Sequence, residues 1–422
     1  QVLAHLQKIK YTKEKYCKGQ HLIVFPKSLV YNWQAEAKKF TPDLKVLVYE
    51  GAKRKSLVKN FESFDLIIMT YAVMRKDIKE LKDYQFSYSV LDEAQYIKNT
   101  TTRVAKAAYL IKSKYKLALT GTPVENHIGE LFSIFRYLIP SILPKGYSLG
   151  KIKSNEESMK FILRGLMPFI LRRTKAEVLT DLPEKVESVL YCEFEKKQEN
   201  IYNEMKTFYQ KSLTQKVSED SLNKSKIQIL EALLRMRQVS CHPGLINKDY
   251  LSLNSSKMIT LMENIEPLIE REEKVLIFSQ FTSFLSIIKQ ELQSRGIGYA
   301  YLDGKTNKRE AVVNSFKKDT SKSVFLISLK AGGVGLNLTE ASYCFLVDPW
   351  WNPDVEAQAI DRIHRIGQSR KVFAYRLITK GSIEEKILKL QQSKRDVSNN
   401  ILATDESLLK QMSTEDLQFL FS

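Results

Sequence analysis

The chain reads YSVLDEAQ over residues 88–95, an apolar strand pattern that ends in two adjacent carboxylates, Asp92 and Glu93. In open α/β sheets, ligands collect at the carboxyl ends of the strands. One carboxylate can there bind Mg²⁺ while its neighbour orients or deprotonates a water that attacks a phosphate. The alternative is a plain strand-to-helix turn in which Asp92 caps the next helix.

Nine further short runs of this kind alternate with helical stretches, which is typical of parallel sheets covered by helices. Four lie before residue 122, at 21–25, 45–49, 65–70 and 115–121, and five lie after residue 273, at 274–279, 299–304, 324–328, 343–348 and 372–378. The two series predict an α/β fold with two parallel-sheet lobes.

The stretch between the two series, residues 141–270, is rich in charge and helical pattern, and its one clear strand signal is VESVLYCEF at 186–194. We therefore expect lobe one at 1–140 and a helical insertion and linker, including the start of lobe two, at 141–256. Lobe two is expected at 257–400 and a tail at 401–422.

Composition sets the class of partner. The chain has 422 residues, of which 43% are hydrophobic, and this excludes disordered and fibrous chains. Its 66 Lys and Arg exceed its 48 Asp and Glu, and 66 − 48 gives a net charge of +18. Such a charge favours nucleic acid, against the alternative of lysines dispersed for solubility. No apolar run approaches a membrane span of ~18 residues, and the four cysteines form no Cys-x-x-Cys pair, which argues against a zinc site.

Three other motifs follow predicted strands or lie on a helical pattern. LALTGTP at 117–123 can place hydroxyls near phosphate oxygens, SLKAGGVGLN at 328–337 lets the backbone approach a ligand, and QAIDRIHRIGQ at 358–368 sets two arginines on one helical face. Arginines so placed can stabilise charge on a transferring phosphoryl group. The alternatives are an ordinary loop, a plain glycine turn and a solvated basic helix face.

The order and spacing of these motifs are far more specific than any one of them. Together they resemble the SWI/SNF-type ATPases of helicase superfamily two, DNA translocases built from two RecA-like lobes. The strings that carry the resemblance are LIVFPKSLVYNW (22–33), MTY (69–71), LDEAQ (91–95), LTGTPVEN (119–126), FILRRTK (169–175), LRMRQVSCHP (234–243), VLIFSQF (275–281), the segment 328–338, DPWWNP (348–353) and QAIDRIHRIGQ.

The resemblance implies ATP as substrate and Mg²⁺ as cofactor, with ATP between the lobes. By the family pattern Asp92 coordinates Mg²⁺, Glu93 activates the attacking water, and Arg362 and Arg365 are arginine fingers. Gly335 and Gln358 are the other positions implied to bind the nucleotide.

The resemblance also implies a track for the DNA backbone. The matching positions are Pro26, Lys27, Ser28, Thr70 and Tyr71 in lobe one, and Ser279, Gln280, Phe281, Lys330 and Gly332 in lobe two. Thr120, Gly121 and Thr122 would couple the nucleotide site to this track. These residue types suit phosphate contacts rather than base edges, so binding is expected to be independent of sequence.

The chain departs from the family in one respect. Members carry a phosphate-binding loop of the Gly-x-Gly-Lys-Thr type before the helix that begins here as QVLAHLQ, and this chain begins after that point. We therefore expect the chain itself to bind ATP poorly and interpret it as a fragment of an active enzyme. The alternative is a shortened, non-catalytic nucleic-acid-binding scaffold.

A third hypothesis is an RNA helicase of the related DEAD-box class. The inserted region and the WWNP string argue against this class. The expected partners are duplex DNA and DNA-bound proteins, the expected state is a monomer, and no membrane is involved. The tail is similar to the endings of bacterial members, which predicts a cytoplasmic protein at the bacterial nucleoid, or a nuclear one in a eukaryote.

Overall fold

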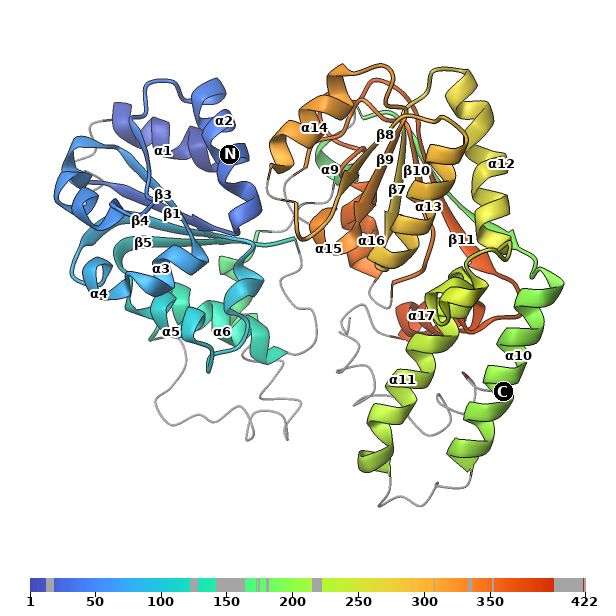
Figure 1. Ribbon diagram of the computed structural model, residues 1–422. Coiled ribbons are helices and arrows are strands. Elements are labelled where there is room, and N and C mark those ends of the chain that lie inside the picture. Colours follow the sequence, from blue (N-terminus) through green and yellow to red (C-terminus); the bar gives the residue numbers. More distant parts are fainter. Residues whose placement is uncertain are drawn as a thin grey trace. The chain divides into compact units, whose positions relative to one another are not determined.

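The chain forms two compact units, Gln1–Thr180 and Asp181–Ser422. The computed structural model describes residues 1–12, 19–121, 128–141, 164–171, 173, 175–179, 182–214, 222–306, 308–332, 336–350, 353–397 and 420. Each unit is built on one parallel sheet, as the alternating strand pattern predicts (Figure 1).

The first sheet has five parallel strands in the order β2-β3-β1-β4-β5. Its central strands are fully buried, which is why they read as unbroken apolar runs rather than as alternating ones. The strands are β1 His21–Phe25, β2 Val46–Val48, β3 Leu66–Thr70, β4 Gln85–Asp92 and β5 Lys112–Leu119.

Helices cover both faces of this sheet, with α1 and α2 on one side and α3, α5 and α6 on the other (Figure 1). The α-helices of the unit are α1 Val2–Tyr11, α2 Val30–Phe40, α3 Tyr71–Lys76, α4 Ile78–Leu81, α5 Arg103–Leu110, α6 Ile128–Leu138 and α9 Lys175–Val178. Its 3₁₀ turns are η1 Lys27–Leu29, η2 Arg54–Ser63, η3 Ala94–Ile97 and η4 Met167–Phe169.

The second sheet has six parallel strands in the order β6-β11-β10-β7-β9-β8. They are β6 Lys185–Cys192, β7 Val275–Ser279, β8 Tyr299–Leu302, β9 Val324–Ser328, β10 Tyr343–Leu346 and β11 Val372–Thr379. The helices are α10 Lys196–Thr214, α11 Leu222–Cys241, α12 Ser256–Glu270, α13 Thr282–Ser294, α14 Arg309–Lys318, α15 Leu329–Gly332, α16 Pro353–Ile360 and α17 Ile383–Val397, with 3₁₀ turns η6 Pro243–Leu245 and η7 Lys248–Tyr250.

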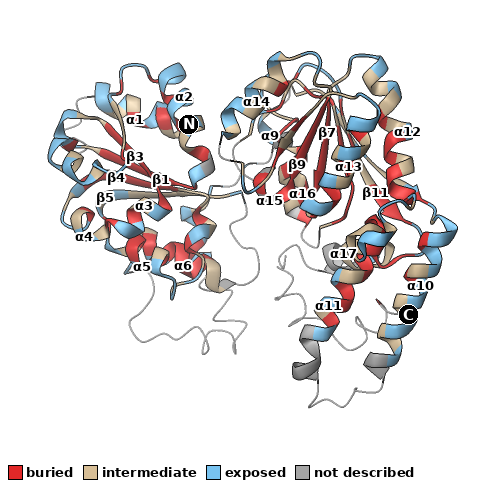
Figure 2. Ribbon diagram, viewed as in Figure 1, coloured by how far each residue is buried: buried red, intermediate tan, exposed pale blue. Residues whose placement is uncertain are grey.

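This sheet separates two apolar cores, one against α12 and α13 and the other against α14, α15 and α16. Figure 2 shows the strands between them as the most buried part of the unit. A further core joins α10 and α11 to the start of α17. The helical pair α10–α11 is therefore packed into the second unit and is not a separate body.

The strand signal at 186–194 becomes β6, which pairs along its whole length with β11 of the second sheet. The second unit accordingly begins at Asp181, inside the range 141–256 in which the sequence places the start of lobe two. The charge-rich stretch is typical of an insertion because β6 lies far in sequence from its partner β11.

The structure also describes the apolar length of the helices and the state of three of the cysteines. No helix in the described ranges is both long and apolar enough to cross a membrane. The thiols of Cys192, Cys241 and Cys344 are free and buried, while Cys17 lies outside the described residues.

Candidate active site

Strand β4 ends at Asp92, and the chain then turns sharply at Glu93, whose φ of 52° and ψ of 55° are left-handed. A non-glycine residue in this region carries backbone strain, which is common at functional sites. The backbone N–H of Glu93 donates to Oδ1 of Asp92 at 2.9 Å. Because η3 begins without a side-chain cap, the helix-capping alternative for Asp92 is not what the structure shows.

The carboxylate of Asp92 is half-buried, and its Oδ2 accepts a hydrogen bond of 2.9 Å from the indole N–H of Trp33. Burial raises the pKa of Asp92, the Trp33 bond lowers it, and the neighbouring charge of Glu93 raises it. Oδ1 and Oδ2 each accept one of these hydrogen bonds and keep a lone pair for a cation.

This donor set fits Mg²⁺, which keeps several waters and takes one or two carboxylates together with substrate phosphates. The described residues hold no group of three or more His, Cys, Asp or Glu side chains that could enclose a metal by themselves. Asp92 is a side chain that could hold Mg²⁺ in this way.

Tyr71 differs from its expected role as a DNA contact. Its side chain is only 3% exposed, its hydroxyl donates to the backbone carbonyl of Asp92 at 2.9 Å, and its ring stacks on Tyr96 at 5.0 Å. The first residue after β3 turns its ring into the core, so Tyr71 braces the end of β4 instead of facing solvent.

Thr120 follows the end of β5 and is connected to Glu93 through the side chain of Gln95. Its hydroxyl donates to Oε1 of Gln95 at 3.0 Å, and Nε2 of Gln95 donates to Oε2 of Glu93 at 2.7 Å. The motif expected to couple nucleotide and DNA therefore contacts Glu93 through one amide. Gly121 is exposed, and Thr122 lies outside the described residues.

The other positions of this unit that were expected to face DNA lie at the same sheet edge, after β1 and β3. Lys27 is exposed, Pro26 is buried before η1, and the side chain of Ser28 lies outside the described set. Thr70 caps α3 by accepting from the N–H of Val73, and it is 7% exposed. Lys27 is the residue among these whose charge is open to solvent.

In the second unit, Gln280 and Phe281 follow β7 beside the end of β10. The backbone N–H of Gln280 donates to both carboxylate oxygens of Asp348, at 3.2 and 3.1 Å, and Phe281 N–H donates to the hydroxyl of Ser279 at 3.0 Å. Ser279 is fully buried, so its hydroxyl shapes the turn. The side chain of Gln280 is half-buried.

The arginine pair was expected on one helical face, and this prediction is wrong. Helix α16 ends at Ile360, and residues 361–367 form turns that close on Gly367, whose φ is 103°. The backbone bonds outward instead of continuing the helix, since the carbonyl of Arg362 accepts from the N–H of Leu338 at 3.0 Å. The guanidinium of Arg365 donates to the backbone carbonyl of Leu336 at 3.2 Å.

These contacts bring the arginines against the end of the glycine-rich segment, although the two motifs are far apart in sequence. Arg362 is 8% exposed and Arg365 is half-buried. Gln358 is half-buried in α16. Lys330 and Gly332 lie in α15, and the burial of these two residues is outside what the structure describes. Gly335 lies outside the described residues.

Sequence reasoning missed Trp33 and Gln95 as members of the site. Gln95 carried a signal, because an amide two positions after a carboxylate at a strand end can turn back to it. Trp33 carried none, since a tryptophan on an amphipathic helix normally packs in the core.

Comparisons with known proteins agree with this arrangement. The SNF2-related domain matches residues 1–245, and the helicase conserved C-terminal domain matches residues 256–367. An uncharacterised ATP-dependent helicase of Mycoplasma genitalium is 36% identical over 95% of this chain and 39% of its own length. The putative ATP-dependent helicase/translocase YwqA of Bacillus subtilis is 35% identical over 96% of this chain and 45% of its own.

Among solved structures, the SWI2/SNF2 ATPase core of Sulfolobus solfataricus in complex with dsDNA is 34% identical, with a TM-score of 0.50. The match covers 99% of this chain and 89% of that one. The chain spans less than half the length of the curated relatives named above. Since the SNF2-related domain alone covers more than half of it, the chain belongs to the SWI/SNF-type family of ATP-dependent helicases, with two RecA-like lobes.

Proposed function

We propose that this chain forms the two lobes of an ATPase that hydrolyses ATP in response to duplex DNA and uses the energy to move along it. The observation that carries the proposal is the contact from Thr120 through Gln95 to Glu93, because it joins the catalytic carboxylate to a neighbouring strand end. The net charge of +18 and the complex of a solved relative with dsDNA support DNA as the partner.

In the proposed mechanism, Glu93 orients and deprotonates the water that attacks the terminal phosphate of ATP. Gln95 holds the Glu93 carboxylate by a hydrogen bond from its amide, next to the left-handed backbone at residue 93. Bound at Asp92, Mg²⁺ would neutralise developing phosphate charge. By the family pattern, Arg362 and Arg365 are proposed as arginine fingers, which stabilise charge that develops on a transferring phosphoryl group.

Proposed contacts to DNA are made by Lys27 in the first unit and by Gln280 in the second, with Thr70 and Phe281 shaping their loops. Cation and amide contacts to phosphates carry no base information, so binding follows the backbone of any duplex. We propose that the chain acts as a monomer on chromosomal DNA and displaces proteins bound to it, at the nucleoid of a bacterium or in a eukaryotic nucleus.

The decisive experiment measures ATP hydrolysis by the chain and by Glu93→Gln, with and without duplex DNA. We expect DNA to stimulate hydrolysis from a low rate, because the chain itself is expected to bind ATP poorly. The Glu93→Gln variant should lose this hydrolysis while binding DNA normally, because only the proton acceptor is removed. Glu50→Gln is the matched control, the same chemical change on an exposed carboxylate of the same unit. Equal hydrolysis by Glu93→Gln and the unsubstituted chain contradicts the role of Glu93.

A second experiment separates the translocase from the alternatives. Single-stranded RNA that stimulates hydrolysis better than duplex DNA would point to an RNA helicase. Absence of hydrolysis, with DNA affinity that ignores an ATP analogue, would point to a non-catalytic scaffold. For the DNA contact itself, Lys27→Ala is expected to lower the slope of log affinity against log salt by about 1.

A further inference from the structure

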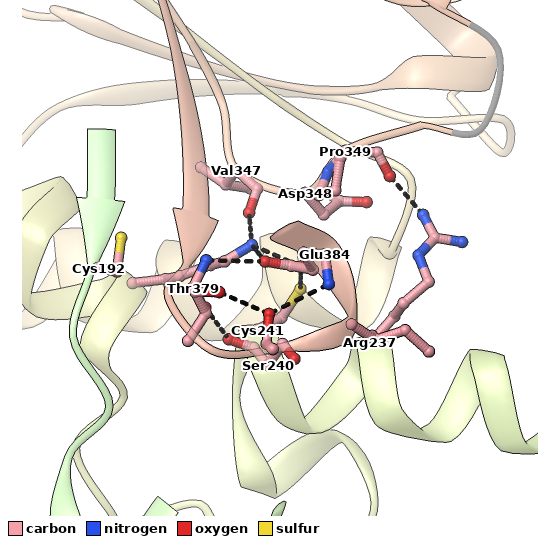
Figure 3. Close-up of polar contacts among 12 residues, drawn as sticks. Cys192, Arg237, Ser240, Cys241, Val347, Asp348, Pro349, Thr379 and Glu384 are labelled. Atoms are coloured by element: carbon pink, nitrogen blue, oxygen red, sulfur yellow. Dashed lines mark hydrogen bonds and ion pairs between the residues drawn. The ribbon is translucent and has the colours of Figure 1, made fainter. Parts of the chain in front are cut away.

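The loop that follows β10 is held by two buried cations from helices outside the sheet. The ammonium group of Lys257, in α12, donates to the carbonyl of Val347 at 2.7 Å, and the guanidinium of Arg237, in α11, donates to the carbonyl of Pro349 (Figure 3). Lys257 is 0% exposed and Arg237 is 2% exposed. The backbone carbonyls on the two sides of Asp348 are thus each held by a charged side chain.

Between these two anchored carbonyls lies Asp348, whose carboxylate accepts the backbone N–H of Gln280. The loop after β10 therefore fixes the loop after β7. Arg237 also reaches the second loop directly, because its guanidinium lies over the ring of Phe281, 5.8 Å from the centroid. One side chain of α11 contacts both loops.

Burying a cation is costly, and a carbonyl or a ring returns only part of that cost. The charge of Arg237 also acts on the buried carboxyl groups of Asp348 and Glu384, whose pKa values burial raises and this charge works to lower. Lys257 is compensated by its ion pair with Glu384, whose two carboxylate oxygens both lie 2.7 Å from the ammonium nitrogen. Oε2 of Glu384 also accepts the N–H of Thr379 at 3.1 Å. The arrangement favours a role in fixing loop geometry over one in stability alone.

We propose that Arg237 is a positioning residue for the DNA-facing edge of the second unit. Arg237 contacts both Phe281 and Pro349 and so holds the two loops in a fixed position relative to each other. Asp348, next to Pro349, then fixes the backbone of Gln280. The pair α10–α11 and this edge consequently move as one body. The inference rests on the proposed function for the assignment of Gln280 to DNA, and Arg237 itself is too buried to touch a phosphate.

The test compares Arg237→Met with Lys274→Met in the full chain. Lys274 also donates to backbone carbonyls, but beside α14 and next to the start of β7, the opposite end of that strand from Gln280. We expect Arg237→Met to weaken binding of a labelled duplex about tenfold, the equivalent of one lost charged hydrogen bond. The salt dependence should not change, because no phosphate contact is removed. Lys274→Met should bind as the unsubstituted chain does.

Hydrogen exchange provides a readout that does not depend on DNA. Exchange at the N–H of Gln280 and Phe281 should be faster in Arg237→Met and unchanged in Lys274→Met, compared at equal folded fraction. Arg237→Lys, which keeps a donor for Pro349 but loses the planar contact with Phe281, should give intermediate values in both measurements.

Unchanged affinity and unchanged exchange in Arg237→Met overturn the proposal. Equal losses in Lys274→Met also overturn it, because they indicate general destabilisation. If the unsubstituted chain binds no duplex, the proposed function fails, and the exchange measurement still decides whether Arg237 positions this edge.

Discussion

Trp33 and Asp92, 59 positions apart in the chain, are joined by a hydrogen bond of 2.9 Å from the indole N–H to the carboxylate. Trp33 is 8% exposed and its ring lies parallel to Phe25 at 6.2 Å, so α2 fixes the donor rigidly. The carboxylate that is proposed to bind Mg²⁺ is therefore oriented by the helix that follows the loop of Pro26 and Lys27.

Trp33→Phe should raise the Mg²⁺ concentration that ATP hydrolysis requires, without unfolding the chain. Phenylalanine keeps the stacking on Phe25 but removes the bond that lowers the pKa of Asp92, so that pKa rises further. Because Mg²⁺ binds the ionised carboxylate, a Mg²⁺ titration of ATP hydrolysis should require more metal, most clearly at acidic pH. The stability cost should be about 1 kcal/mol.

Tyr84→Phe is the control, since it removes another half-buried hydrogen bond in the same unit, to Gln20. If both variants shift the Mg²⁺ requirement equally, Trp33 has no specific role at Asp92.

Thr120→Val should lower DNA-stimulated hydrolysis more than basal hydrolysis. Valine removes the hydroxyl that orients Gln95, and the carboxylate of Glu93 then loses the tie to β5. One lost hydrogen bond of about 1 kcal/mol corresponds to roughly a fivefold loss of stimulation. Steady-state hydrolysis over a range of duplex concentrations measures this ratio.

The matched variant is Thr102→Val, which removes the side-chain cap of α5 but leaves the Glu93 network intact. An equal fall in basal and stimulated rates for Thr120→Val would show that the contact serves catalysis alone.

His21 should make the first unit unstable in mild acid. Burial lowers its pKa from 6.5 to about 4. Above pH 6.5 both folded and unfolded chains hold a neutral ring, and between pH 6.5 and about 4 only the unfolded chain takes the proton. Stability is therefore lost as pH falls through this window, by about 3 kcal/mol at its lower end.

Urea unfolding between pH 7 and 4 measures this loss. His21→Phe keeps the edge contact with Tyr88 and cannot titrate, so its unfolding midpoint should fall less with acid. A parallel fall in both proteins would assign the acid sensitivity to other groups.

The buried pair Lys257 and Glu384 should show strong coupling. Burial acts to lower the pKa of Lys257, but the charge of Glu384 outweighs it and the pKa is raised. Lys257→Met leaves Glu384 charged and without its cation, at a cost of about 3–5 kcal/mol. Lys257→Met with Glu384→Gln should recover part of this, because the amide oxygen still accepts from Thr379.

Denaturant unfolding of the two single variants and the double variant gives the coupling energy. Additive losses would mean that the two charges do not stabilise each other.

The strands were predictable because buried parallel strands are written as short apolar runs that need no alternation. All ten runs are strands in the structure, and the ends of β4 and β5 place Asp92, Glu93 and Thr120 as expected. The conformation of the arginine pair was not predictable from its helical spacing. Helix α16 ends at Ile360, and the carbonyl of Arg362 accepts from the N–H of Leu338 instead of from a later turn of the helix. Tyr71 was misread because sequence does not show which way a residue turns after a strand.

The sequence by itself determined the family, the two parallel sheets and the edge at which the carboxylates lie, because these follow from motif order and apolar periodicity, which are local. Only the tertiary structure decided that Trp33 orients Asp92, that Gln95 links Thr120 to Glu93, and that Arg237 lies beneath two loops of the second unit. These contacts join residues on different elements, and their geometry is set by how helices pack on the sheets.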